Sequence, residues 1–190
     1  MKKIYILLLT LTITSLSFGQ TVAYTSFEEA NTGSQYIDTG DAAVAHDLVN
    51  NSGQSDVNYT PGAGALEIGF DARYVPFDTP SDGLTDGDFV GVTDFVGTVG
   101  SFTDGNKGYQ FSDSDGVMIL EFDPVDLTAY TNIQVSLDYF FQSTGWEAAD
   151  LIKIYVKDLT NNTQTDILDT EGSDIDDLNI ERVPTMIVYK

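Results

Sequence analysis

The sequence predicts an all-β protein built as an antiparallel two-sheet β-sandwich, and three observations lead there. Residues 133–141 (IQVSLDYFF) and 151–157 (LIKIYVK) alternate apolar and polar side chains, as strands with one buried face do. Short segments of this kind recur at intervals of roughly 8–15 residues, with Gly, Asp, Asn or Pro between them. No stretch has the periodicity of a helix of three or more turns. The two central runs are joined by a short polar loop, so we expect them to pair with each other.

The remaining strands are expected on both sides of this central pair. Residues 71–88 are interpreted as a loop, because Pro76, Pro80, Gly83 and Gly87 break regular structure. Residues 42–49 carry a weak apolar pattern typical of a short strand or a helical turn. The other predicted strands are 22–27, 62–70, 89–99, 108–111, 117–122, 163–168 and 185–189.

The N-terminus has the pattern of a secretory signal peptide. Two lysines are followed by the apolar run Ile4–Leu16 and by small residues up to Gly19. The run is shorter than the roughly 20 residues that span a membrane. We therefore expect residues 1–19 to be removed, residues 20–190 to form one domain, and the protein to be secreted or periplasmic without membrane insertion. An apolar strand that reaches almost to Lys190 favours a C-terminally truncated version of a longer protein.

Composition excludes several classes of function. The chain has 30 acidic against 8 basic residues, and a formal net charge of −22. Such a chain repels phosphate backbones, so we expect no nucleic-acid partner. The absence of cysteine excludes disulfides, thiolate zinc sites and cysteine nucleophiles. A hydrophobic content of 42% is sufficient for a packed core.

Acidic loops point to a calcium ion. Ca²⁺ takes six to eight oxygen ligands, and the turn Asp113-Ser114-Asp115-Gly116 has the alternating acids of a calcium loop. An ordinary β-turn is the alternative for these residues. Glu28, after the first predicted strand, and Asp150, before the second central strand, are further candidate metal ligands. Aspartates also crowd two further loops, at positions 78, 82, 86 and 88 and at positions 174, 176 and 177.

Aromatic residues point to a glycan. Trp146 is the only tryptophan and lies in a polar loop, where a flat indole suits the apolar face of a sugar. A plug over the edge of the core is the alternative. Tyr109 and Phe140 are further candidate ligand-binding residues. A hydrolase is poorly supported, because His46 is the only histidine and lies in no recognisable motif.

Several segments resemble secreted bacterial jelly-roll modules of the MAM-like and galactose-binding-like type, which accompany extracellular enzymes and adhesins. These are SFEE (Ser26–Glu29), LTDGDFVGV (Leu84–Val92), KGYQFSDSDGVMILEF (Lys107–Phe122) and VSLDYFFQSTGWEAADLIKIYV (Val135–Val156). The resemblance implies a jelly-roll-like, non-catalytic module with a structural Ca²⁺ and a polysaccharide or cell-surface glycan as ligand. It also implies that Glu28 is a metal ligand, whereas the C-terminal segment RVPTMIVYK has no acid to serve as its partner.

The sequence thus leaves three hypotheses. The first is a calcium-stabilised glycan-binding module. The second is a structural accessory domain of a larger secreted hydrolase or adhesin, with no ligand of its own. The third is an enzyme that uses two of its many carboxylates. The oligomeric state is not indicated by any pattern.

Overall fold

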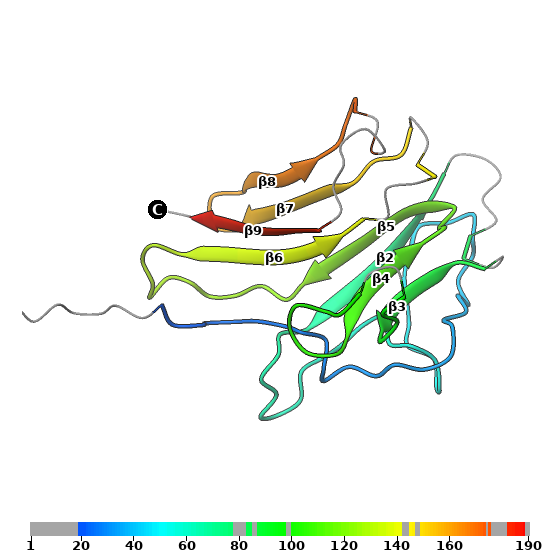
Figure 1. Cartoon of the computed structure of the whole chain (residues 1–190), viewed down its shortest axis with the longest axis horizontal. Helices are drawn as coiled ribbons and strands as arrows, with labels where there is room; N and C mark the ends of the chain where they lie inside the picture. The colour runs from blue at the N-terminus through cyan, green and yellow to red at the C-terminus, as the bar shows by residue number, and fades with distance from the viewer. Residues whose placement is uncertain are drawn as a thin grey trace, which may run out of the picture.

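The structure is a computed structural model that describes residues 19–77, 83–84, 87–97, 100–141, 145–146, 149–173 and 175, and the backbone of 182–188 (Figure 1). This part of the chain contains no helix, and its regular elements are β-strands. They are β1 (His46–Asp47), β2 (Phe70–Pro76), β3 (Phe89–Thr93), β4 (Gly108–Ser112), β5 (Gly116–Phe122), β6 (Gln134–Phe140), β7 (Lys153–Asp158), β8 (Thr163–Asp169) and β9 (Arg182–Val188).

The described strands form four antiparallel sheets. The largest has the order β1-β2-β5, and the others are the pairs β3-β4, β6-β9 and β7-β8. In Figure 1, β2 to β5 occupy one half of the view and β6 to β9 the other. The predicted all-β class and antiparallel pairing are therefore confirmed.

The main core lies between the β2-β5 pair and the β3-β4 pair. Phe70, Ala72 and Tyr74 of β2 are buried, while the residues between them face outward. Their register partners on β5 are Phe122, Leu120 and Met118, so the six side chains share one face. The residues of β3 and β4 that pack on this face are Val90, Val92 and Tyr109.

The turn between β4 and β5 depends on a glycine. A Cβ on Gly116 would overlap the ring of Tyr74 and the carbonyl of Val75. The hydroxyl of Tyr74 donates to the main-chain oxygen of Asp115 at 3.0 Å. Asp113, at φ 58°, completes the connection between the two strands. The acids that suggest a calcium loop thus also form a tight turn packed against a core tyrosine.

Several predicted elements are wrong in position or pairing. Residues 22–27 and most of 62–70 are not in strands, whereas residues 71–76, interpreted as loop, belong to β2. The interpretation gave too much weight to Pro76. This proline is the last residue of β2, where the missing N–H removes little stability from the strand. The predicted hairpin of the two central runs is also wrong, since β6 pairs with β9 and β7 with β8. Only four residues join β7 to β8, and Asn162 supplies a positive φ there, which favours this local hairpin.

Residues 1–18 of the predicted signal peptide and the aspartates at 78, 82, 86, 174, 176 and 177 lie outside the described residues. Within the described residues, no helix has the length and apolarity needed to cross a membrane. The predicted final strand, 185–189, is β9, which begins three residues earlier at Arg182.

Phe70 gives a test of this core. It is 1% exposed, and its ring contacts those of Phe27, Tyr59, Tyr109 and Phe122. Replacing Phe70 by Ala should lower the free energy of unfolding by about 3–5 kcal/mol, because the cavity cannot be refilled. Urea titration followed by circular dichroism measures the change. Leu66→Ala is the matched control, since Leu66 is 71% exposed; equal effects of the two substitutions would contradict the assigned core.

Candidate functional site

The described residues form an open pocket of about 420 Å³ lined almost entirely by amide and hydroxyl side chains. We call it the amide pocket. None of the described residues that line it is aromatic or basic. Its lining residues are Asn31, Thr32, Asn50, Asn51, Ser52, Gly53, Gln54 and Asp56.

Two loop segments, residues 31–37 and 50–58, build the pocket by pairing with each other. Ser34 forms a parallel bridge with Gln54, and its N–H donates to the oxygen of Gly53 at 3.1 Å. The N–H of Asp56 donates to the oxygen of Asn31 at 3.0 Å. A Cβ on Gly33 would crowd the backbone of Gln54, so glycine permits this close approach. The backbone of the pocket is therefore fixed without a regular ladder.

Amide side chains complete the framework. The Oδ1 of Asn50 accepts from the N–H groups of Val57 and Asn58 at 2.8 and 2.9 Å. The Nδ2 of Asn51 donates to the oxygen of Ile37 at 2.9 Å, and the Oε1 of Gln54 accepts from the N–H of Ile37 at 2.8 Å. Each amide thus substitutes for a missing backbone partner. The pocket is pre-organised before any ligand enters.

Other polar atoms of the pocket carry no hydrogen bond within the described residues. They include the hydroxyls of Thr32 and Ser52, Oδ1 of Asn31, Oδ1 of Asn51 and Nε2 of Gln54. The pocket therefore offers both donors and acceptors to a ligand.

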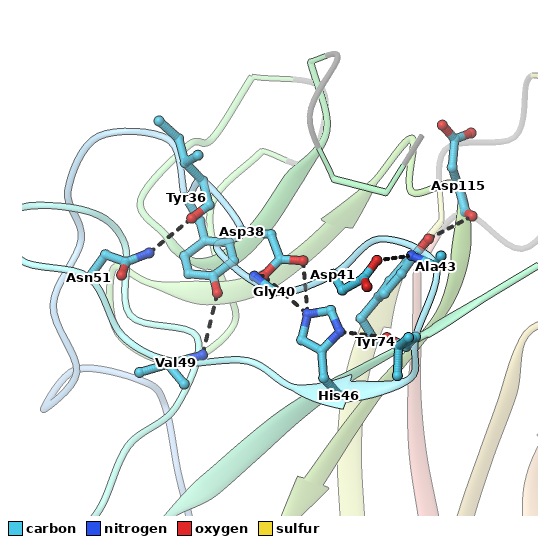
Figure 2. Close-up of polar contacts among 12 residues, drawn as sticks. Tyr36, Asp38, Gly40, Asp41, Ala43, His46, Val49, Asn51, Tyr74 and Asp115 are labelled. Atoms are coloured by element: carbon cyan, nitrogen blue, oxygen red, sulfur yellow. Dashed lines mark hydrogen bonds and ion pairs between the residues drawn. The ribbon is translucent and has the colours of Figure 1, made fainter. Parts of the chain in front are cut away.

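A half-buried His46–Asp38 pair lies next to the pocket (Figure 2). Nε2 of His46 lies 2.9 Å from Oδ2 of Asp38, and its Nδ1 lies 2.7 Å from the oxygen of Val44. A Cβ on Gly40 would overlap the imidazole, so glycine lets the turn close over the ring. Asp38 follows Ile37 directly, and Ile37 bonds to Asn51 and Gln54. The pair thus anchors one wall of the pocket.

Both ring nitrogens of His46 face acceptors, which suits the protonated imidazolium. Partial burial alone would lower the pKa of His46. The Val44 carbonyl and the Asp38 carboxylate outweigh this and raise the pKa above its ordinary 6.5. Neither nitrogen is directed at a serine or threonine hydroxyl among the described residues, so a nucleophilic triad is not assembled here.

The segment SFEE is held by Glu67, which is 5% exposed. Its Oε1 accepts from the N–H and hydroxyl of Ser26 at 3.0 and 2.6 Å and from the N–H of Glu28 at 3.2 Å. Its Oε2 accepts from the N–H of Glu29 at 3.2 Å. Burial alone would raise the pKa of Glu67, but these donors outweigh it and keep the pKa below 4.5. This carboxylate takes the place of a ladder for the N-terminal segment.

The candidate metal ligands are dispersed. The Oε1 of Glu28 accepts from the N–H of Asn106, and its main-chain oxygen accepts from Nζ of Lys107 at 2.9 Å. Asp113 and Asp115 lie in the β4–β5 turn, and the half-buried Asp150 precedes β7. Within the described residues, no three acidic, histidine or cysteine side chains gather in a way that would hold a metal ion.

The candidate aromatic residues Tyr109, Phe140 and Trp146 all line one broad cavity of the described structure. The ring of Tyr109 packs among those of Phe27, Phe70 and Phe111, and its hydroxyl donates to the oxygen of Val57 at 3.0 Å, which favours a core role. Burial raises its pKa. Trp146 is half-buried and meets the ring of Phe141 edge-on, with centroids 6.5 Å apart. Phe140 is the last residue of β6 and is half-buried.

Comparison with models of known protein families, with curated proteins and with solved structures found no match. The site is therefore interpreted from its own chemistry.

Sequence reasoning missed the amide pocket. The segment NSGQSDVN (Asn51–Asn58) is dense in amides and hydroxyls, and that density was the available signal. Its pairing with residues 31–34 could not be inferred, because neither segment has a strand-like alternation.

The His46–Asp38 pair gives a test by nuclear magnetic resonance, since a single histidine yields one set of imidazole signals. The pKa of His46 in the folded chain should lie above 6.5, and Asp38→Asn should lower it by removing the negative charge. The pair then stabilises the fold fully below pH 6.5, and this contribution is lost as the pH rises through the folded pKa. Asp47→Asn is a matched control, because Asp47 pairs with Arg73 instead. An unchanged pKa in Asp38→Asn would contradict the pair.

Proposed function

We propose that the chain is a non-catalytic binding module that takes a polysaccharide or cell-surface glycan in the amide pocket. The observation that carries this proposal is the concave lining of amides and hydroxyls, already held in place by their own hydrogen bonds. Pre-organised polar groups bind with little loss of conformational entropy. Sugar hydroxyls both donate and accept, as such a lining requires.

Two exposed aliphatic residues whose backbones adjoin pocket residues support the same ligand class. Ile37, whose backbone bonds to Asn51 and Gln54, is 58% exposed, and Val49, next to Asn50, is 64% exposed. A sugar presents apolar C–H faces as well as hydroxyls. Exposed aliphatic side chains beside amides therefore complement it in both respects.

A binding role fits the described side chains better than catalysis. Both nitrogens of His46 are engaged. Of the residues that the structure describes, Asp56 is the only acidic one that lines the pocket, so these residues supply no pair of carboxylates there. The N-terminal sequence pattern supports export, which would place the module where extracellular glycans occur. Stacking of a sugar on Trp146 remains a separate prediction from the sequence.

The pocket hydroxyls test the proposal. Thr32→Val and Ser52→Ala each remove one hydroxyl with no partner in the described structure, so the fold should be unaffected. Each should weaken glycan binding about two- to tenfold, because that change in affinity corresponds to the free energy of one neutral hydrogen bond. A glycan array selects the ligand and isothermal titration calorimetry measures its affinity. Thr131→Val is the matched control, on an exposed residue outside the pocket. Array binding that survives both pocket substitutions unchanged would place the site elsewhere, and no binding at all would favour the structural accessory domain.

Calcium needs its own test. A structural Ca²⁺ at 100 times its Kd should stabilise the fold by about 2.7 kcal/mol and raise the melting temperature by several degrees. Melting of the purified chain is compared in EDTA, in millimolar Ca²⁺ and in millimolar Mg²⁺. A rise specific to Ca²⁺ is the expected result. Identical curves in all three would refute the calcium ion and leave the glycan proposal intact.

A further inference from the structure

Among the described residues, Asp56 is the only charged one that lines the amide pocket. Its Oδ2 accepts from the N–H of Asn31 at 2.8 Å and from Nδ2 of the same residue at 2.9 Å. Its main-chain oxygen accepts from the N–H of Val92 on β3 at 2.9 Å. Both the backbone and one carboxylate oxygen are thus fixed.

The other carboxylate oxygen is available to a ligand. Within the described residues, Oδ1 of Asp56 carries no hydrogen bond. A carboxylate oxygen has two lone pairs and can accept hydrogen bonds from one or two hydroxyl groups. Because Oδ2 is saturated by Asn31, the direction in which Oδ1 points is set before binding. A hydrogen bond to this charged acceptor is also stronger than one to a neutral amide.

Charge decides which glycans fit. No Lys or Arg of the described part of the chain lines the pocket, and the whole chain has a formal net charge of −22. A carboxylate or sulfate on a sugar would be brought next to Asp56 without a cation to pair with it. Desolvation of the ligand's charge and repulsion between like charges would both weaken the binding of such a ligand.

Resting on the proposed glycan binding, we infer that the amide pocket selects non-acidic sugars, with Asp56 as the specificity-determining residue that accepts their hydroxyl groups and rejects sugars bearing carboxylate or sulfate.

Matched oligosaccharides test this inference directly. Neutral β-1,4-mannohexaose and β-1,4-hexamannuronate share a backbone and differ in the carboxylate at each sugar. Cellohexaose and its β-1,4-glucuronate counterpart form a second pair. All four are placed on an array with a wider set of neutral and acidic glycans, and affinities are measured by calorimetry at low and at moderate salt.

The wild-type chain should bind neutral ligands at least tenfold more tightly than their acidic counterparts, and this ratio should narrow with salt as repulsion is screened. Asp56→Asn should weaken neutral binding at least tenfold and reduce the ratio, since an amide can still accept from Asn31 but turns a donor toward the ligand. Asp104→Asn is the matched control, because it removes the same charge from an exposed residue outside the pocket.

The outcomes separate the inference from the function on which it rests. Acidic glycans bound as tightly as their neutral counterparts, or more tightly, would overturn the role of Asp56 while leaving glycan binding in place. Equal affinity of wild type and Asp56→Asn for a neutral ligand would also overturn it. Absence of binding to every glycan would remove the proposed function, and the inference with it.

Discussion

The pairing of β2 with β5 is the interaction on which the rest of the structure depends. It places six side chains on one face and provides the surface on which β3 and β4 pack. The opposite edge of β2 holds the pocket. At this edge β2 first pairs with the two residues of β1. Beyond β1, the N–H of Leu48 donates to the main-chain oxygen of Ala72 on β2. The N–H of Ala72 in turn donates to Oδ1 of Asn58. Tyr59 then pairs with Phe70. The segment 50–58 is therefore hydrogen-bonded to β2 at both ends, and these bonds fix the backbone of the amide pocket to the core.

Polar side chains form hydrogen bonds with backbone groups that have no partner in a regular strand. Buried backbone groups need partners, and a chain with long irregular segments must find them outside regular strands. Here Asn50, Asn51 and Gln54 serve the loops of the pocket, while Glu67 serves the N-terminal segment. Several carboxylates of this acidic chain are thus hydrogen-bonded to backbone N–H groups, which stabilises their charge without a metal ion. The abundance of Asp and Glu is in this respect structural as well as electrostatic.

The sequence predicted the fold class because alternation is a local signal. Residues 117–122, 163–168 and 108–111 show it, and each corresponds to a strand within two residues at either end. Pairing is not local, so the partner of β6 was predicted wrongly. For the site, the pattern directed attention to Trp146 and to the aspartate turns, because those residue types are conspicuous. The pocket residues are ordinary Asn, Ser and Gln, and only the contact of 31–34 with 53–56 makes them one surface. That contact rests on hydrogen bonds between irregular segments, for which the sequence has no periodic signature.

The carboxylate of Asp56 in an otherwise uncharged lining, within a strongly acidic chain, has a consequence for the proposed recognition of glycans. Long-range repulsion acts on an acidic polymer before it reaches the surface, and the screening length is about 8 Å at physiological salt. A neutral polymer is unaffected by this field and meets only the local donors and acceptors. Selectivity then has two components, one set by the overall charge and reduced by salt, the other set by Oδ1 of Asp56 within the pocket. The first is distributed over many surface residues and survives any single substitution. The second depends on Oδ1 of Asp56, whose direction is set by the two bonds of Asn31 to Oδ2, so a single isosteric change separates the two components.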